Sequence, residues 1–384
     1  MLIILYLATI SFCALYAPQP LLAVFSEQFN VAPEYTSLLI TVTLIPLGIA
    51  PILYGYILES IPSKTLLKYS FTLLAITETG FIFINDFWVL LAIRSFQGLL
   101  FPAIFTALMT YISTTASKSH IKKQVTYYIA ATILGGFLGR FIAGFTATYA
   151  SWHWAFAILS IGLMIGVLLL FYLEQDIKLH LLHPTWRAIS QTFQQPIFFR
   201  IYLIIFLTFF CFASLLNVLP FRLMGLNQQT SEIQIAFAYS GYLIGIISAL
   251  NSVRVSEWLG ESRVIIIGLI VYFTSLLIFL IPNEYSFFAN MFMFCGGMFL
   301  VHGVLSSHLN HLAQSNKGLV NGLYIACYYA GGALGSYVPN YLYRFAGWEI
   351  YLLFLLSLVG IALGLAYNLL MLERTLKNHK INSF

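Results

Sequence analysis

One stretch of the sequence occurs twice, as YIAATILGGFLGR at residues 128–140 and as YIACYYAGGALGS at residues 324–336. Both copies begin with Tyr-Ile-Ala and carry the pattern Gly-Gly-x-Leu-Gly near their end, without a gap between these two parts. The Ala-x-Trp tripeptides at residues 150–152 and 346–348 share the same offset of 196 residues. A constant offset of this size predicts a chain made of two related halves.

Composition places these halves in a membrane. Of the 384 residues, 60% are hydrophobic and 8% are charged, whereas a soluble domain has about 25% charged residues. A membrane-spanning helix needs about 20 apolar residues. We therefore expect an all-α integral membrane protein with twelve transmembrane helices, at residues 2–24, 35–58, 66–84, 87–112, 125–149, 153–173, 200–223, 233–253, 264–281, 286–310, 319–343 and 348–371.

Basic residues predict the orientation of these spans. Of the 18 Lys and Arg residues, Arg94 and Arg140 lie within expected spans, and only Arg222 and Arg344 lie in loops on one side. The other fourteen lie on the opposite side or at the ends of the chain. Because loops rich in Lys and Arg remain in the cytoplasm, we expect both termini to be cytoplasmic. The apolar start, residues 1–17, lacks a basic region before it and is expected to be a retained first span.

The longest polar stretch divides the chain into two bundles of six spans. We expect an N-terminal six-helix bundle at residues 1–173, a cytoplasmic linker at residues 174–199, and a C-terminal six-helix bundle with a short tail at residues 200–384. The linker is long enough for an amphipathic segment on the membrane surface.

Several functions are disfavoured by the same residues. The net charge of +5 is spread over short loops, so we expect no nucleic-acid partner. The four cysteines lie in apolar runs without metal-type spacing, which predicts neither a metal site nor a cofactor. Because the sequence has no hydrolase or phosphate-binding motif, we expect a protein that is not an enzyme.

Short motifs in the N-terminal half resemble those of the major facilitator superfamily. Residues 55–64 are similar to its Gly-x-Leu-Ala-Asp-Arg-x-Gly-Arg-Lys loop after span two, and they keep Gly55, an acid as Glu59, and Lys64. The family's Arg-x-x-Gln-Gly motif in span four is intact at residues 94–98. The resemblance covers the whole chain and implies alternating access to a substrate site between the bundles.

Glycines of the repeated stretch fit the same resemblance. Small residues at this spacing let membrane helices approach closely. The positions expected to act in gating or close packing are Gly55, Glu59, Lys64, Gly98, Gly135, Gly136, Gly139, Gly331 and Gly335.

Other stretches are similar to an arabinose-efflux-like, acriflavine-associated branch of bacterial drug exporters. They are LYAPQPLL at residues 15–22, Gly139-Arg140, SWHW at residues 151–154, and His302 with the region of Tyr328, Tyr329 and Gly331. The branch implies a proton-coupled antiporter that exports drug-like or metabolite solutes across the bacterial inner membrane, and we expect the protein to be a monomer. The alternatives are an importer or uniporter of a polar nutrient, or an exporter of a siderophore-like solute, with the same fold.

Three charged residues lie deep in expected spans, where a charge costs at least about 2.5–3.5 kcal/mol. Glu78, Arg94 and Arg140 lie at similar depths, close enough for contact. Arg94 either binds substrate or modulates the pKa of a proton carrier, or it forms a structural ion pair with Glu78. Glu78 is correspondingly a proton-coupling site or half of that pair. Arg140 is either a gating or anion-contacting residue or a side chain that reaches the membrane surface.

Polar residues of other spans complete the candidate site. Pro18 and Pro20 should interrupt the first span, which makes Gln19 a candidate substrate contact. His302 either relays protons or bonds substrate, or it is a satisfied interior histidine. The expected substrate and coupling residues are therefore Arg94, Arg140, Glu78, His302, Gln19, Gln97 and Tyr328, with Tyr16, Asn217, Tyr239, Tyr324 and Tyr329 as a further aromatic and amphipathic lining.

Overall fold

A computed structural model of the chain describes residues 1–115, 121–173, 185–313 and 316–381. All the regular structure in these ranges is helical. The side chains of residues 51–60, which include Gly55 and Glu59, lie outside the description. Residues 174–184 of the expected linker lie outside it as well.

The N-terminal half forms one bundle of apolar helices. Its elements are α1 (Leu2–Tyr16), the 3₁₀ turn η1 (Gln19–Leu21), α2 (Leu22–Gln28), α3 (Pro33–Ser60), α4 (Ser63–Phe83), α5 (Phe87–Thr115), α6 (Ile121–Tyr149), α7 (Trp152–Leu169) and the 3₁₀ turn η2 (Leu170–Tyr172). A short helix, α8 (Trp186–Gln194), follows in the expected linker, capped by Thr185, whose hydroxyl accepts a hydrogen bond from the Ala188 N–H at 3.2 Å.

The C-terminal half forms the second bundle. Its elements are α9 (Pro196–Leu226), α10 (Glu232–Ala238), the 3₁₀ turn η3 (Tyr239–Gly241), α11 (Tyr242–Leu259), α12 (Glu261–Ile278), α13 (Glu284–Leu312) and α14 (Lys317–Ile381). The first of these helices begins at Pro196, before the expected border at residue 200.

Twelve membrane passes follow from these helices. Within the described ranges, 11 helical segments have the length and apolar character needed to cross a bilayer. The last of them contains two passes, because Gly347 interrupts α14 with φ 81° and ψ 179°. Several passes are longer than the sequence predicted; for example, the expected span 87–112 corresponds to α5, which extends to Thr115.

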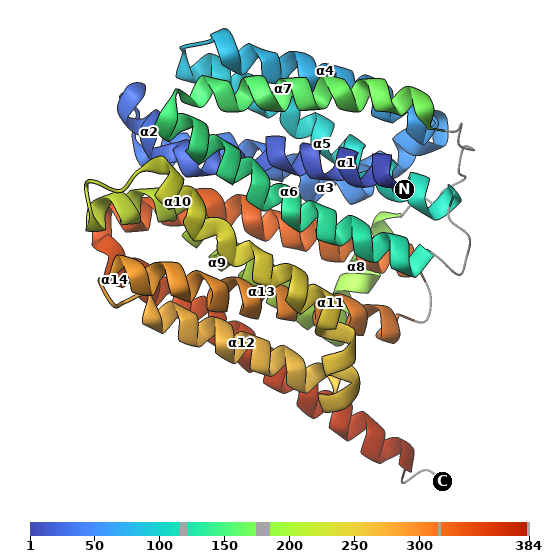
Figure 1. Ribbon diagram of the computed structural model, residues 1–384. Coiled ribbons are helices and arrows are strands. Elements are labelled where there is room, and N and C mark those ends of the chain that lie inside the picture. Colours follow the sequence, from blue (N-terminus) through green and yellow to red (C-terminus); the bar gives the residue numbers. More distant parts are fainter. Residues whose placement is uncertain (116–120, 174–184, 314–315, 382–384) are drawn as a thin grey trace.

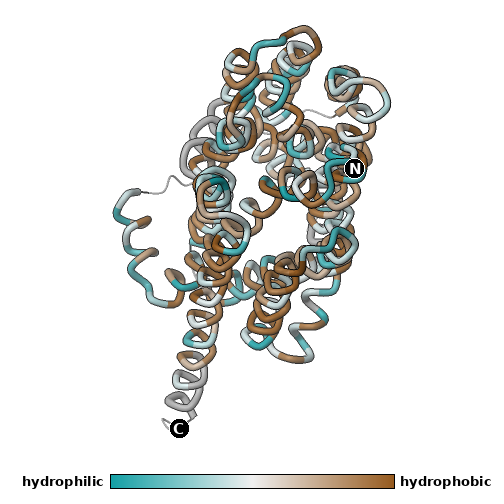
Figure 2. Tube along the Cα trace, turned by 90° about the vertical axis from the view of Figure 1, so that its left-hand side faces the viewer, coloured by the Kyte–Doolittle hydropathy of each residue, from teal (hydrophilic) through white to brown (hydrophobic). Residues whose placement is uncertain are grey.

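The two bundles lie side by side along their helices (Figure 1). α3 packs against α14, and α6 packs against α10 and α11. We call the end with α2 and α10 the distal end, and the end with the N-terminus and α8 the proximal end (Figure 1). Figure 2 looks from the distal side and shows the helices end-on, with hydrophobic residues predominating along them.

Glycines of the repeated stretch let the halves pack in the same way. A Cβ on Gly135 or Gly139 would lie 2.4 Å from the Thr9 carbonyl oxygen or 2.3 Å from that of Cys13, both in α1. A Cβ on Gly331 or Gly335 would lie 2.2 Å from the Phe206 oxygen or 2.1 Å from the Phe210 oxygen, both in α9. Helix backbones therefore touch at matching positions, as the repeat predicted.

Candidate functional site

The first membrane pass is broken near the distal end. Proline has no N–H, so Pro18 cannot donate to the carbonyl of Ala14, and Pro20 cannot donate to that of Tyr16. Helix α1 accordingly ends at Tyr16, and the chain continues through η1 into α2. The break leaves carbonyls of α1 without their usual helical donors.

Arg94 of α5 supplies donors at this break. Its Nη1 donates to the Ala14 oxygen at 3.1 Å and its Nη2 donates to the Leu15 oxygen at 2.6 Å. Its Nε donates to the Leu39 oxygen of α3 at 3.0 Å. Arg94 is fully buried, so this side chain joins α5 to α1 and α3 inside the N-terminal bundle.

Gln97 links Arg94 to Glu78. Arg94 Nη1 donates to Gln97 Oε1 at 2.8 Å, and Gln97 Nε2 donates to Glu78 Oε2 at 2.8 Å. A direct ion pair between Glu78 and Arg94 was one expectation from the sequence, and it is wrong because the Gln97 amide lies between the two charges. The other carboxylate oxygen, Glu78 Oε1, is buried and accepts no hydrogen bond from the described residues.

Gln19, directly after Pro18, is hydrogen-bonded to the other bundle. Its Oε1 accepts a hydrogen bond from Arg140 Nε at 2.7 Å, and its Nε2 donates to Asn217 Oδ1 of α9. Asn217 Nδ2 then donates to the Ser336 carbonyl oxygen of α14 at 3.0 Å. The Ser336 hydroxyl shares a 2.7 Å hydrogen bond with the Thr41 hydroxyl of α3.

Arg140 of α6 lies at the opposite end of this hydrogen-bonded series from Thr41, away from Glu78 and Arg94. Its Nη2 donates to the Tyr242 hydroxyl of α11 at 3.1 Å, and its Nη1 donates to the Gly136 carbonyl oxygen. The guanidinium carbon lies 4.3 Å from the ring centre of Tyr16, 4.4 Å from that of Tyr242 and 4.9 Å from that of Tyr239. The three deep charges therefore form two separate clusters instead of one.

We call the series Tyr242, Arg140, Gln19, Asn217, Ser336 and Thr41 the central polar chain. It crosses between the two halves at three points: Arg140 to Tyr242, Gln19 to Asn217, and Ser336 to Thr41. Helices α6, α11, α9, α14 and α3 and the η1 turn are joined by it. Separating the halves at the distal end requires these three contacts to break.

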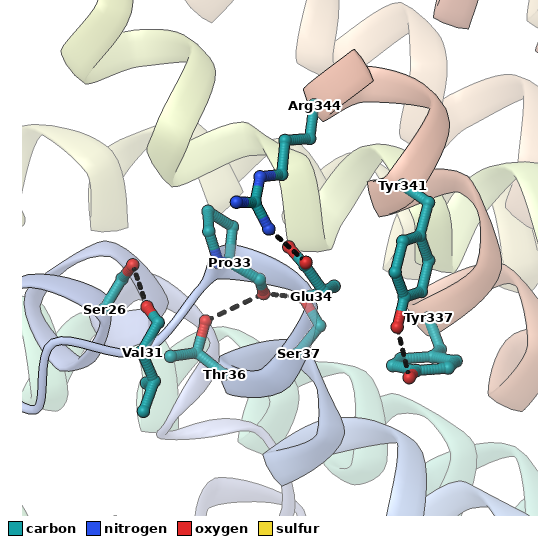
Figure 3. Close-up of polar contacts among 9 residues, drawn as sticks. All are labelled: Ser26, Val31, Pro33, Glu34, Thr36, Ser37, Tyr337, Tyr341 and Arg344. Carbon is teal, nitrogen blue, oxygen red and sulfur yellow. Dashed lines mark hydrogen bonds and ion pairs between the residues drawn. The ribbon is translucent and has the colours of Figure 1, made fainter.

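A second set of contacts lies nearer the distal rim. Arg344 of α14 forms an ion pair with Glu34 of α3 (Figure 3). On the other side, the Thr148 hydroxyl of α6 donates to Glu232 Oε2 at 3.0 Å and accepts from the Ile233 N–H of α10 at 2.9 Å. The rim and the central polar chain together hold this end closed.

The repeat relates the two sides of the closed end. Thr148 and Arg344 are 196 residues apart, as are Arg140 and Ser336. Gln19 and Asn217 are 198 residues apart, as are Glu34 and Glu232. Each half therefore contributes positions at nearly the same offset, and the side chains differ in every pair except Glu34 and Glu232. The buried cation at Arg140 has a neutral counterpart at Ser336, so the shared helix packing does not require it.

His302 and Tyr328 lie in a separate aromatic cluster of the C-terminal half. His302 Nδ1 shares a 2.9 Å hydrogen bond with the Tyr324 hydroxyl, and the Tyr328 ring stacks on Phe209 with centres 3.7 Å apart. The Tyr328 and His302 rings are 4.7 Å apart. Among the described residues, no hydrogen bond or ring contact joins His302 or Tyr328 to the central polar chain, but Tyr328 lies near enough to Tyr16 and Tyr242 for an electrostatic interaction.

The remaining predicted positions divide between packing and the proximal end. A Cβ on Gly98 would lie 2.5 Å from the Val42 carbonyl oxygen, and one on Gly136 would lie 3.3 Å from Arg140 Nη1. Lys64 donates to the Leu173 carbonyl oxygen at the proximal end. No group of three potential metal ligands occurs in the part of the chain that the structure describes.

Several residues of this site were missed in the sequence. Thr41, Tyr242, Glu34, Glu232 and Thr148 have no local motif, and their partners come from the other half of the chain. The repeat offset of 196 residues was the available signal for Thr148, because it relates Thr148 to Arg344, whereas Glu34 and Glu232 are 198 residues apart.

The comparison with known proteins agrees with this two-bundle arrangement. Residues 4–253 and 201–383 match the family model of the Major Facilitator Superfamily. The chain belongs to this superfamily. It is thus a multi-pass membrane transporter and not an enzyme, with a small-molecule substrate.

Relatives of this superfamily member are bacterial. An uncharacterized transporter of Buchnera aphidicola subsp. Schizaphis graminum (strain Sg) is 23% identical over 343 residues, which is 88% of this chain and 83% of that protein. The uncharacterized MFS-type transporter YybF of Bacillus subtilis (strain 168) is 22% identical over 333 residues, 84% of this chain and 81% of that protein.

Solved structures share the fold of this transporter. A bacterial homolog of the human lysosomal transporter Spinster, in an inward-facing conformation, matches with a TM-score of 0.77 and 12% identity, over 96% of this chain and 95% of that chain. The nucleoside transporter NupG matches with a TM-score of 0.75 and 12% identity, over 96% and 98% of the two chains.

Proposed function

We propose that this transporter exports small drug-like or metabolite molecules across the bacterial inner membrane in exchange for protons. In this proposal both chain ends are cytoplasmic, so that the closed distal end faces outward, and the protein acts as a monomer. The concentration of basic residues on one side supports the orientation.

One observation carries the proton coupling: a hydrogen-bonded series joins Glu78 to the broken first pass through Gln97 and Arg94. Glu78 Oε1 has no hydrogen-bond partner among the described residues, so it is the atom on which we place the transported proton. A proton there removes the negative charge that faces Gln97 and Arg94, and Arg94 in turn holds the Ala14 and Leu15 carbonyls.

The break gives this series a route to the closed end. The Ala14 carbonyl lies just before Pro18, and Gln19 lies just after it and bonds both Arg140 and Asn217. A shift of Arg94 therefore acts on the helix that carries Gln19. In this mechanism, a proton on Glu78 weakens the hold of Arg94 on α1 and biases the central polar chain toward opening.

Purified protein in proteoliposomes tests the proposal with imposed pH gradients. The solutes are a labelled lipophilic cation, an aromatic carboxylate and a nucleoside. Proton exchange should concentrate a substrate in the acidic compartment. Concentration of a substrate in the alkaline compartment contradicts exchange for protons and instead supports an importer. This alternative is considered because a nucleoside transporter shares the fold.

The Glu78→Gln variant tests the assigned proton site. It should still let substrate equilibrate across the membrane but should not concentrate it under a pH gradient. Glu257→Gln is the matched control, because Glu257 is exposed. Undiminished concentration of substrate by Glu78→Gln would remove Glu78 from the coupling mechanism.

A further inference from the structure

The Arg140 guanidinium is a buried cation that has no counter-charge in the part of the chain that the structure describes. Its side chain is 0% exposed. None of the carboxylates in the described ranges accepts a hydrogen bond from it; Glu34 pairs with Arg344, and Glu232 accepts from Thr148. Its three acceptors, on Gln19, Gly136 and Tyr242, are all neutral. Burying a charge without a partner of opposite charge is costly, and ring faces offset only part of that cost.

One of these acceptors depends on closure of the distal end. Tyr242 belongs to α11 of the opposite half, so separating α6 from α11 removes its hydroxyl and its ring from Arg140. Gln19 belongs to the same half as Arg140, and opening breaks only its bond to Asn217 of the opposite half. The Gly136 carbonyl belongs to the same helix as Arg140. Opening therefore leaves the Nη2 donor of a charged group available to water or to a ligand.

We infer that Arg140 binds the carboxylate of a small amphipathic organic anion when the distal end is open, and that such anions belong to the substrates of this transporter. A guanidinium presents parallel N–H donors that fit a carboxylate in two hydrogen bonds. The face of Tyr16, which belongs to the same half as Arg140, lies beside the cation and would contact an apolar or aromatic body.

The anion and the Tyr242 hydroxyl compete for the same donor. A bound carboxylate satisfies Nη2 in the open state as Tyr242 does in the closed state, so anion binding and distal closure oppose each other. By linkage, removing the Tyr242 hydroxyl should favour the anion. This inference rests on the transport function proposed above, and it concerns which substrate class that transporter accepts.

Thermal unfolding of the full-length protein in detergent tests the inference without any transport step. The probes are 2-naphthoate and its neutral amide, 2-naphthamide, each titrated to give an apparent Kd from the rise in Tm. For the wild type, naphthoate should bind at least about tenfold more tightly than naphthamide, the factor expected for charge-assisted hydrogen bonds.

Three variants sharpen this test. Arg140→Gln should lose the preference for naphthoate, and Tyr242→Phe should strengthen naphthoate binding about tenfold by removing one competing hydrogen bond. Arg222→Gln is the matched control, because Arg222 lies over the Trp348 ring, outside the central polar chain; it should bind naphthoate like the wild type. If Arg140→Gln does not fold, the direction of change in Tyr242→Phe still decides.

The inference is overturned if the wild type binds the two probes equally, if Arg140→Gln keeps its preference for naphthoate, or if Tyr242→Phe weakens the binding of naphthoate. These outcomes are distinct from failure of the proposed function. Proton-driven transport of a neutral or cationic solute together with equal probe binding removes only the anion site. Selective naphthoate binding without pH-driven transport of any solute removes proton coupling and leaves the anion site.

Discussion

Arg94 Nη1 donates a 3.1 Å hydrogen bond to the carbonyl oxygen of Ala14, the oxygen for which Pro18 has no N–H. A side chain from α5 thus replaces a backbone donor that the sequence of the first pass removes. The Arg94 guanidinium is hydrogen-bonded at the break in the first pass. It therefore links the interior of the N-terminal bundle to Gln19. The contacts explain two residues of the intact Arg-x-x-Gln-Gly motif: Arg94 donates to the carbonyls at the break, and Gln97 donates to Glu78.

Removing Arg94 should cost both stability and transport. Arg94→Ala removes this donor from the Ala14 and Leu15 carbonyls at the break, and each unsatisfied buried group costs about 1–3 kcal/mol. The Leu39 carbonyl also loses a bond, but it lies inside the α3 helix. Arg94→Lys keeps the charge but cannot reproduce the planar array of donors, so its Tm should lie between those of the wild type and Arg94→Ala. Thermal unfolding in detergent and proteoliposome transport measure the two effects. A wild-type Tm for Arg94→Ala would show that the contacts do not support the break.

Pro18→Ala should make the first pass less dependent on Arg94. An alanine at this position has an N–H that can reach back toward the Ala14 carbonyl, because Pro18 already has helical φ and ψ of −66° and −19°. Arg94→Ala should therefore lower the Tm less in a Pro18→Ala background than in the wild type. The four proteins form a double-mutant cycle, and strictly additive changes would mean that the two residues act independently.

The sequence predicted the membrane fold better than the pairing of its charges. Composition and the repeat were sufficient for two bundles and for close helix packing at the glycines of α6, because these depend on local apolarity and small residues, but they did not identify α1 as the partner helix. Glu78, Arg94 and Arg140 were expected to meet because their depths are similar. Depth does not say which way a helix face points, however, and Arg140 faces α11 and the first pass instead. Gln97, one helical turn from Arg94, occupies the space that a direct ion pair needed.

Exchanging the charges of Glu34 and Arg344 tests the distal rim. The Glu34 side chain is 5% exposed and the Arg344 side chain is 45% exposed, so screening by solvent limits the pair to about 1 kcal/mol or less. Arg344→Gln should nevertheless lower the Tm more than Glu34→Gln, because it leaves the more buried charge without its partner. The double exchange Glu34→Arg with Arg344→Glu should recover part of the loss caused by either single exchange. Equal losses for the two glutamine variants would contradict this asymmetry.

Adding one methyl group tests whether the glycines of the repeat support the same contact in both halves. A Cβ on Gly139 would lie 2.3 Å from the Cys13 carbonyl oxygen, and a Cβ on Gly335 would lie 2.1 Å from that of Phe210. Because both obstacles are backbone atoms, the helices must move apart, and we expect Gly139→Ala and Gly335→Ala each to cost about 1–3 kcal/mol. Gly360→Ala is the matched control, because Gly360 lies in the same helix α14 as Gly335 and its added Cβ would meet no neighbouring heavy atom within 4 Å. Alanine is the better helix former by about 1 kcal/mol, so the control should keep or raise the wild-type Tm.

Gly139→Ala should also impair transport more than its effect on stability predicts, because α6 carries Arg140 one residue further on and the displacement separates it from Gln19. If both variants unfold at the temperature of the Gly360→Ala control, the close approach of the helices is not needed for the fold.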